Sequence, residues 1–322
     1  MKLGNTVDLQ REYFYSGETK TKDFRITNLK KLRDIINMFE DNILMALSKD
    51  LGKSNFEAYA TEITMAYEEI DLAIENLDQW MEPIQEKTSI TSMPAKSYTL
   101  YEPMGVTLII SPWNYPFLLA IDPIIGAMAA GNTIILKSSR KSKYTSELLK
   151  DILNANFESK YLFVVDNDQV SHEELLSYNY DHIFYTGGYK VGKKIMEAAS
   201  KNLSKLTLEL GGKSPAIVDK EANIGLAARS IAWGNTVNAG QTCVSPDYIL
   251  VHASVKERFI RELENTLIEF YGSNPLTNHD YPKIIDESHL EKLSSLLDGQ
   301  NIRFGGDADS DLCKLEPTIV AV

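Results

Sequence analysis

The sequence has few cysteines, no long uninterrupted apolar run and no excess of positive charge. Only Cys243 and Cys313 are present among 322 residues; a secreted disulfide framework usually has more, so we expect a reducing, cytoplasmic compartment. The most apolar stretch, 116–136, is interrupted by Asp, Pro, Gly and Asn, which argues against a membrane span. Residues 1–14 are polar and do not resemble a signal peptide. A net charge of -12 argues against a nucleic-acid-binding surface.

The first third of the chain is predicted to be helical. Apolar residues recur at helical spacing from Leu29 to Leu47 and predict a helix that ends at Gly52. A second apolar stripe, from Ile63 to Trp80, predicts a helix that ends before Pro83. We interpret both stripes as core-facing surfaces.

Short β-rich runs then alternate with helices, which predicts an α/β fold with a parallel, Rossmann-like sheet covered on both faces. A second α/β unit begins near Gly211, and Gly211-Gly212 is a candidate hinge. Ligands bind at the carboxyl ends of parallel strands, so the residues after each strand are the candidates for a ligand site. The predicted strands are 106–110, 133–136, 162–165, 182–185, 205–208, 214–218 and 248–251, and the predicted helices are 116–130, 143–155, 189–201, 255–270 and 286–297.

Two candidate cofactor sites follow predicted strands. In the segment 185–192, a glycine turn leads into a helix and can bring backbone N–H groups to a phosphate. The usual Gly-x-Gly-x-x-Gly pattern is absent, and an ordinary tight turn is the alternative. Lys137 follows strand 133–136 and can bond a ribose hydroxyl, while Arg140 can pair with a 2′-phosphate. The alternative for both is a solvated basic loop.

A third candidate site contains Cys243, within Gly-Gln-Thr-Cys. A lone cysteine is more often a small buried apolar residue, and a nucleophile needs an access route and polar partners. Glu209 and Asn114 each follow a predicted strand; their alternatives are an exposed carboxylate and a turn former between two prolines. A cysteine, a carboxylate and an amide at strand ends fit oxidative acyl chemistry.

Taken together, these segments resemble the aldehyde dehydrogenase superfamily, most closely its class 3 branch. The resemblance covers nearly the whole chain, and its most specific elements are Glu-Leu-Gly-Gly-Lys-Ser-Pro at 209–215 and Gly-Gln-Thr-Cys at 240–243. The other matching stretches are 53–59, 112–116, 131–137 and 181–187.

The resemblance implies a catalytic role for three residues. Cys243 matches the nucleophile that forms a thiohemiacetal and then a thioester with an aldehyde. Asn114 matches the oxyanion donor, acting with the backbone N–H of Cys243, and Glu209 matches the general base for the deacylating water. The resemblance implies no metal.

The resemblance also implies an NAD or NADP site. Lys137 matches the ribose-binding lysine, and the other residues assigned to the cofactor are Trp113, Arg140, Thr186, Gly187, Gly188 and Val191. Two positions depart from the family pattern. Arg140 stands where the family often has glutamate, which leads us to expect a shift toward NADP. Gly188 stands where serine is common.

The resemblance further divides the chain into a cofactor domain (1–82 and 101–210), a bridging hairpin (83–100) and an incomplete catalytic domain (211–322). Family members continue past the segment that resembles 315–320, so we expect open apolar surface and weak or no activity for this chain alone. The expected partners are a small aldehyde and, in a full-length form, a second copy in a homodimer. Tyr115 and Trp233 are candidates for an aromatic channel or for packing.

Two readings from other classes remain. One is a cysteine acyl-transfer or esterase enzyme that uses Cys243 and Glu209 without a dinucleotide. The other is a non-catalytic, truncated remnant that keeps the fold.

Overall fold

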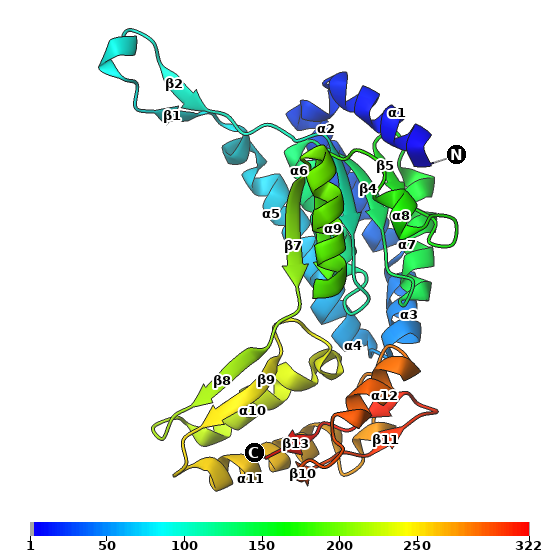
Figure 1. Ribbon diagram of the computed structural model, residues 1–322, viewed down its shortest axis with the longest axis vertical. Helices are drawn as coiled ribbons and strands as arrows, with labels where there is room; N and C mark the ends of the chain where they lie inside the picture. Colours follow the sequence, from blue (N-terminus) through cyan, green and yellow to red (C-terminus); the bar gives the residue numbers. More distant parts are fainter. Residues whose placement is uncertain (1–2, 322) are drawn as a thin grey trace.

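The computed structural model describes residues 3–321. Its first part is a layer of helices packed on a sheet (Figure 1). The helices are α1 (Leu3–Tyr15), η1 (Glu18–Lys20), α2 (Lys22–Met38), α3 (Glu40–Leu51), α4 (Asn55–Ala58), the π-helical η2 (Tyr59–Ile63) and α5 (Thr64–Met81).

The prediction of a single helix ending at Gly52 is wrong, because this segment forms two helices. The apolar stripe from Leu29 to Leu47 belongs to two helices, because the backbone breaks at Phe39 (φ −110°, ψ 17°). The bend lets α2 pack on α5 and α6 while α3 turns to follow α7. Gly52 ends α3 in the left-handed region, with φ 66°, as expected for a C-terminal glycine.

The predicted parallel sheet is confirmed. Five parallel strands lie in the order β5-β4-β3-β6-β7, so β3 is central. The strands are β3 (Val106–Ile110), β4 (Thr133–Lys137), β5 (Leu162–Val164), β6 (His182–Gly187) and β7 (Lys205–Leu210), and the intervening helices are α6 (Leu118–Ala130), α7 (Lys143–Asn156), α8 (His172–Leu175) and α9 (Tyr189–Asn202).

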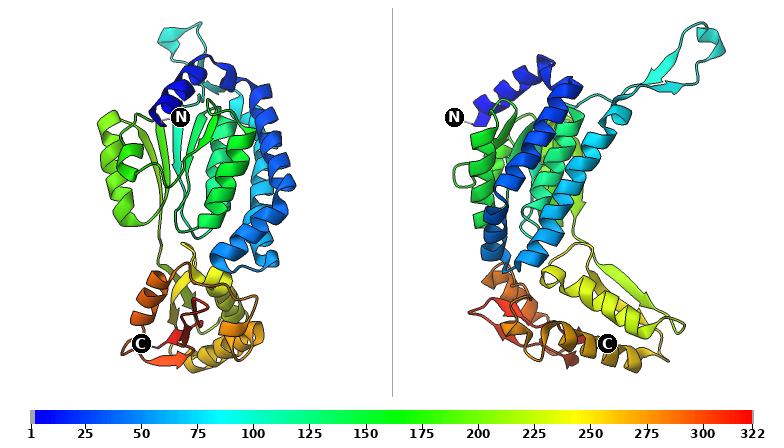
Figure 2. Two further views of the ribbon diagram at one scale, coloured as in Figure 1. Left: turned by 90° about the vertical axis from the view of Figure 1, so that its right-hand side faces the viewer. Right: turned by 180° about the vertical axis from the view of Figure 1, so that it is seen from behind.

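Helices cover both faces of this sheet (Figure 2), and a separate apolar core lies on each face. Ile109 of β3 faces the core made with α2, α5, α6 and α7, whereas its neighbours Leu108 and Ile110 face the core made with α1 and α9. All five residues of β3 are buried, which is why the strand appears in the sequence as a continuous apolar run.

A thin hairpin projects away from the helical layer (Figures 1 and 2). Its antiparallel strands are β1 (Ile84–Glu86) and β2 (Ser97–Thr99), and the short helix η3 (Ile90–Ser92) lies at its tip. All three residues of β1 are exposed, so the arm has no core of its own.

The second α/β unit follows β7 directly, and β7 points toward it in Figure 1. Parallel strands β8 and β9 carry α10 and α11, whose apolar residues pack into a third core around Phe259. Its elements are β8 (Ser214–Val218), α10 (Ile224–Thr236), η4 (Val237–Gly240), β9 (Pro246–Val251), α11 (Lys256–Tyr271), η5 (Pro275–Thr277), α12 (Glu287–Ser295), β10 (Ile302–Phe304), β11 (Ala308–Asp309), β12 (Lys314–Leu315) and β13 (Ile319–Val320). Among the described residues, none of the helices combines the length and apolar character needed to cross a bilayer.

Candidate active site

Cys243 lies in the turn between η4 and β9, at the junction of the two α/β units, and it is exposed. The segment after β7 passes directly against it. A Cβ built on Gly212 would lie 2.4 Å from the carbonyl oxygen of Cys243, so this approach requires glycine. Glu209, near the end of β7, is exposed and is three residues from that contact.

Asn114, in the loop after β3, is joined by two hydrogen bonds to residues 238–243, the cysteine loop. Its Nδ2 donates to the carbonyl oxygen of Gln241 at 2.8 Å, and its own carbonyl oxygen accepts from Nδ2 of Asn238 at 2.7 Å. The next residue, Tyr115, shares a 2.7 Å hydrogen bond between its hydroxyl and that of Thr242. Because an amide nitrogen has two hydrogens, the Gln241 contact leaves one for a bound oxyanion.

The cysteine loop has an unusual backbone. Asn238, Ala239 and Gly240 are all left-handed, with φ of 54°, 51° and 75°. Such a φ costs a non-glycine residue about 1 kcal/mol or more, so contacts elsewhere must hold the loop. One comes from Gln241, whose Nε2 donates to the carbonyl oxygens of Asn238 and Lys283, both at 3.0 Å.

Sequence reasoning missed a group of charged residues beneath this loop. Lys53 and Glu62 form an ion pair at 2.5 Å with both side chains fully buried. Glu57 accepts a 2.7 Å hydrogen bond from the backbone N–H of Asn238. Burial raises the pKa of Glu57, although the Lys53 ammonium and the Asn238 amide oppose the rise. The available signal was three charged residues within an otherwise helical, core-facing segment.

This charge group also contacts the beginning of α6. The second oxygen of Glu62 accepts from the backbone N–H groups of Phe117, at 2.9 Å, and Leu118, at 3.1 Å. The Lys53 ammonium lies 4.1 Å from the ring centroid of Tyr115. Burial raises the pKa of Tyr115 to about 12, so its hydroxyl stays protonated at neutral pH and can bond Thr242.

Lys137 is the last residue of β4 and is buried. Its Nζ donates to Oδ1 of Asn167 at 3.1 Å and to the carbonyl oxygen of Ser138 at 3.3 Å. Burial, and then the charge of Arg140, lower the pKa of Lys137 to about 8. Arg140 is exposed and donates through Nε, at 2.9 Å, and Nη2, at 2.6 Å, to the carbonyl oxygen of Asn167.

The glycine turn joins β6 to α9. Thr186 lies opposite Glu209 in the β6–β7 register, so a predicted cofactor residue and the predicted base are neighbours. A Cβ on Gly187 would lie 2.4 Å from the Tyr185 hydroxyl, whereas a Cβ on Gly188 would meet nothing within 4 Å. Val191, in the first turn of α9, is 40% exposed, which leaves this end of the helix accessible.

Trp113 lies at a contact between the two units. Its ring packs edge-on against His289 of α12, with centroids 5.0 Å apart. Lys141, from the loop after β4, pairs with Asp286 at 2.5 Å and lies 3.1 Å from Nδ1 of His289. Burial opposes ionisation of Asp286, but hydrogen bonds from Lys141 and His289 outweigh it and lower its pKa to about 2.

The predicted residues therefore fall into connected pairs: Asn114 with the cysteine loop, Gly212 with Cys243, and Thr186 with Glu209. Among the described residues, no hydrogen bond joins the Cys243 thiol to Asn114 or Glu209. Tyr115 packs under Lys53, and Trp233 of α10 is 64% exposed.

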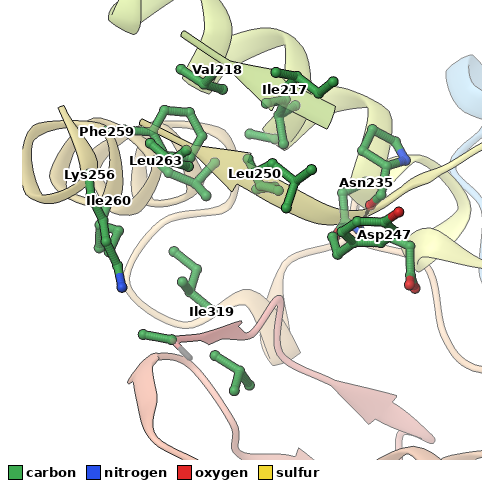
Figure 3. A pocket seen from close by; sticks show the side chains of 18 of the residues that line it. Ile217, Val218, Asn235, Asp247, Leu250, Lys256, Phe259, Ile260, Leu263 and Ile319 are labelled. Atoms are coloured by element: carbon green, nitrogen blue, oxygen red, sulfur yellow. Dashed lines mark hydrogen bonds between the residues drawn. The ribbon is translucent and has the colours of Figure 1, made fainter. Parts of the chain in front are cut away.

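A large pocket lies elsewhere, between β8, β9, α11 and β13, with a volume of about 910 Å³ (Figure 3). Its lining is mainly apolar, and Ile217 and Leu250 are 75% and 54% exposed. Cys243 is not part of this lining, so we place the candidate site at the junction and not in the pocket.

Comparison with known proteins identifies the family. The model of the aldehyde dehydrogenase family matches residues 11–322. The chain belongs to the aldehyde dehydrogenase family. It is 44% identical over 312 residues to 4,4′-diaponeurosporen-aldehyde dehydrogenase of Staphylococcus aureus, covering 96% of this chain and 68% of that protein. It is 40% identical to the dimeric NADP-preferring aldehyde dehydrogenase of Rattus norvegicus, covering 99% and 70%.

A solved structure of the substrate-bound state of Staphylococcus aureus AldH superposes on this aldehyde dehydrogenase chain with a TM-score of 0.95 and 43% identity, covering 99% of this chain and 70% of that one. Several relatives are named family 3, which confirms the class 3 resemblance. The chain spans about two thirds of the length of these curated relatives, 64% to 70%.

Proposed function

We propose that this chain carries the reactive centre of an enzyme that oxidises an aldehyde to a carboxylic acid with NAD or NADP. The observation that carries the proposal is the exposed Cys243, in a strained loop tied to Asn114 and packed against the segment that follows Glu209. Family membership supports the same chemistry.

In the proposed reaction, the Cys243 thiolate forms a C–S bond with the carbonyl carbon. The carbonyl electron pair moves onto oxygen, where the second amide hydrogen of Asn114 and the backbone N–H of Cys243 stabilise the negative charge. The nicotinamide supplies the hydride acceptor when it is bound. Glu209 removes a proton from the water that attacks the resulting thioester, which releases the acid and restores the thiolate.

The residues at the carboxyl ends of β3, β4 and β6 fit a dinucleotide. Open space lies in front of Gly188 at the start of α9, where helix N–H groups favour a phosphate. Lys137 is next to Ser111, whose backbone N–H donates to the Lys137 carbonyl oxygen at 3.1 Å. The hydroxyl oxygen of Ser111 is buried and has no partner among the described residues. Lys137 and Ser111 would serve the ribose hydroxyls, and Thr186, Gly187, Gly188 and Val191 the pyrophosphate.

We also propose that Arg140 favours NADP. Nη1 of Arg140 is not engaged by the contacts that its Nε and Nη2 make with Asn167, so it can pair with a 2′-phosphate. The rat relative is named NADP-preferring. Rates with both cofactors test this, because an Arg140→Glu variant should reverse the preference; strict preference of the parent protein for NAD would exclude it.

We propose the domain division 1–82 with 101–210, 83–100, and 211–322. The exposed β1–β2 arm fits a role in forming a homodimer, in line with the dimeric rat relative. We further propose that the 322-residue chain alone turns over slowly, since its relatives are about half as long again.

The test of the proposed function is aldehyde-dependent formation of reduced nicotinamide, measured by absorbance. Cys243→Ser should abolish it, and Asn114→Ala should lower the rate about 100- to 1000-fold, the usual effect of losing one oxyanion donor. Undiminished turnover by Cys243→Ser would exclude the mechanism. Ester hydrolysis without any aldehyde-dependent reduction would instead favour a cysteine acyl-transfer enzyme.

A further inference from the structure

Glu57 is a half-buried carboxylate that the proposed reaction does not use. It lies on α4, where the Ser54 hydroxyl accepts the backbone N–H of Glu57 at 3.3 Å and fixes the start of that helix. From there, its Oε1 accepts the backbone N–H of Asn238 at 2.7 Å. The two residues are 181 positions apart in the chain, so this contact brings the helical layer to the cysteine loop.

The contact falls at the first of the three left-handed residues. Asn238 and Ala239 adopt φ of 54° and 51° without being glycine, and a relaxed loop would leave this region. A charge-assisted hydrogen bond to the Asn238 N–H opposes that relaxation. Burial raises the pKa of Glu57, and the charge of Lys53 opposes that rise and favours the ionised acceptor.

The position of Asn238 in turn sets the position of Asn114. The side-chain amide of Asn238 donates to the backbone carbonyl oxygen of Asn114 at 2.7 Å. The side-chain amide of Asn114 donates to the carbonyl oxygen of Gln241, two residues before Cys243. A shift of the loop would therefore move the amide of Asn114 relative to the thiol. Misplacement by about 1 Å can lower a rate about 100-fold.

We propose that Glu57 is a positioning residue, which holds the cysteine loop so that the Asn114 amide and the Cys243 thiol act on the same carbonyl group. This inference rests on the proposed function of Cys243 and Asn114. It adds a role for a residue that does not itself touch the substrate.

The test compares two reactions of the same sulfur atom. Acylation by p-nitrophenyl acetate passes through an oxyanion and needs the amide, whereas alkylation by iodoacetamide is a direct displacement and does not. The ratio of the two rates reports oxyanion alignment and cancels any change in the fraction of thiolate. A Cys313→Ser background leaves Cys243 as the sole cysteine.

Three substitutions at Glu57 separate the hydrogen bond from the charge. Glu57→Leu should lower the ratio about 10- to 100-fold, the range for a lost hydrogen bond to a charged group. Glu57→Gln keeps an acceptor and should stay within about threefold of the parent ratio. Glu57→Asp keeps the charge but shortens the reach by one methylene, and should lower the ratio about 3- to 10-fold. If the Leu variant does not fold, the ratio measured for the Asp variant tests the proposal.

Asp50 provides the matched control. It is a buried carboxylate whose pKa, like that of Glu57, is raised by burial, and it accepts the backbone N–H of Thr145 at 2.8 Å at the start of α7. Asp50→Leu should destabilise the fold and leave the ratio unchanged.

The outcomes separate this inference from the proposed function. If the parent protein is acylated no faster than a Cys243→Ser control, the proposed function fails. If acylation depends on Cys243 but the Leu and Asp variants both keep the parent ratio, Glu57 has no positioning role. A fall in the ratio with Asp50→Leu, or with Glu57→Gln as large as with Glu57→Leu, would also overturn the inference.

Discussion

The buried Lys53–Glu62 pair allows a sharp prediction about stability. Both side chains are 0% exposed, and their charged atoms are 2.5 Å apart. Lys53→Met removes the cation and leaves the carboxylate of Glu62 in the core with two backbone N–H donors, from Phe117 and Leu118. Breaking a buried pair in this way costs about 3–5 kcal/mol, because an uncompensated buried charge remains.

Removing both charges should cost less than removing one. In the double variant Lys53→Met/Glu62→Gln, the glutamine oxygen can still accept one of the two α6 N–H groups. The remaining loss should be about 1–2 kcal/mol, for one weakened and one missing hydrogen bond. The double variant should therefore be about 2 kcal/mol more stable than Lys53→Met alone, a coupling typical of residues in direct contact.

The assay is urea unfolding, followed by far-ultraviolet circular dichroism and by tryptophan fluorescence to check that one transition describes both signals. Arg229→Ala is the control, because its pair with Glu269 is at the surface and solvent screens it, so its loss should be small. A Lys53→Met cost below about 1 kcal/mol, or a double variant less stable than the single one, would refute the argument.

Two further predictions concern residues that we assign to the cofactor site. Because burial and then Arg140 lower the pKa of Lys137 to about 8 from 10.5, the native state loses this proton before the unfolded state does. Stability should therefore rise by up to about 3 kcal/mol from pH 8 to pH 10.5, relative to Lys137→Met, in urea titrations; parallel curves would contradict this. Gly187→Ala should lower the free energy of unfolding in urea and Gly188→Ala should leave it almost unchanged, since only the Cβ added at Gly187 meets the Tyr185 hydroxyl; equal effects would contradict this.

The central sheet could be predicted closely from the sequence, and the reason is physical. A parallel strand covered on both faces must be apolar at every position, so β3 appears as an uninterrupted run that differs from the helices around it. The predicted range 106–110 is the observed β3. The β6 and β7 strands each run two residues beyond the prediction, because their ends, Thr186-Gly187 and Glu209-Leu210, pair with each other and the pattern of single strands does not show pairing.

The break at Phe39 could not be predicted in this way. Helical spacing of apolar residues continues across it, since α2 and α3 both face the core. The spacing of apolar residues shows which side of a helix is buried. A bend that keeps the same side buried does not change that spacing, so it cannot be predicted from it. The bend is set by the two surfaces that α2 and α3 pack on, which are formed by segments later in the chain.

In the candidate site, too, some residues could be predicted from the sequence and others could not. Residues that would contact a substrate, such as Cys243 and Asn114, occur in short motifs because their chemistry demands particular side chains. The residues that position them need only a charge or an acceptor at the right point in space. Glu57 meets Asn238 across 181 residues through a backbone N–H, an atom that every residue except proline possesses. No pattern of side chains can therefore reveal that contact.

It follows that the segment 238–243, Asn-Ala-Gly-Gln-Thr-Cys, does not contain the information for its own conformation. Left-handed φ at Asn238 and Ala239 is unfavourable locally, and the compensating contacts come from α4, from the loop after β3 and from the segment around Lys283. The reactivity that we propose for Cys243 would then be a property of the junction between the two α/β units, since each of those contacts crosses the junction or supports it. A loop of identical sequence on another scaffold would relax toward right-handed φ and lose the proposed alignment of thiol and amide.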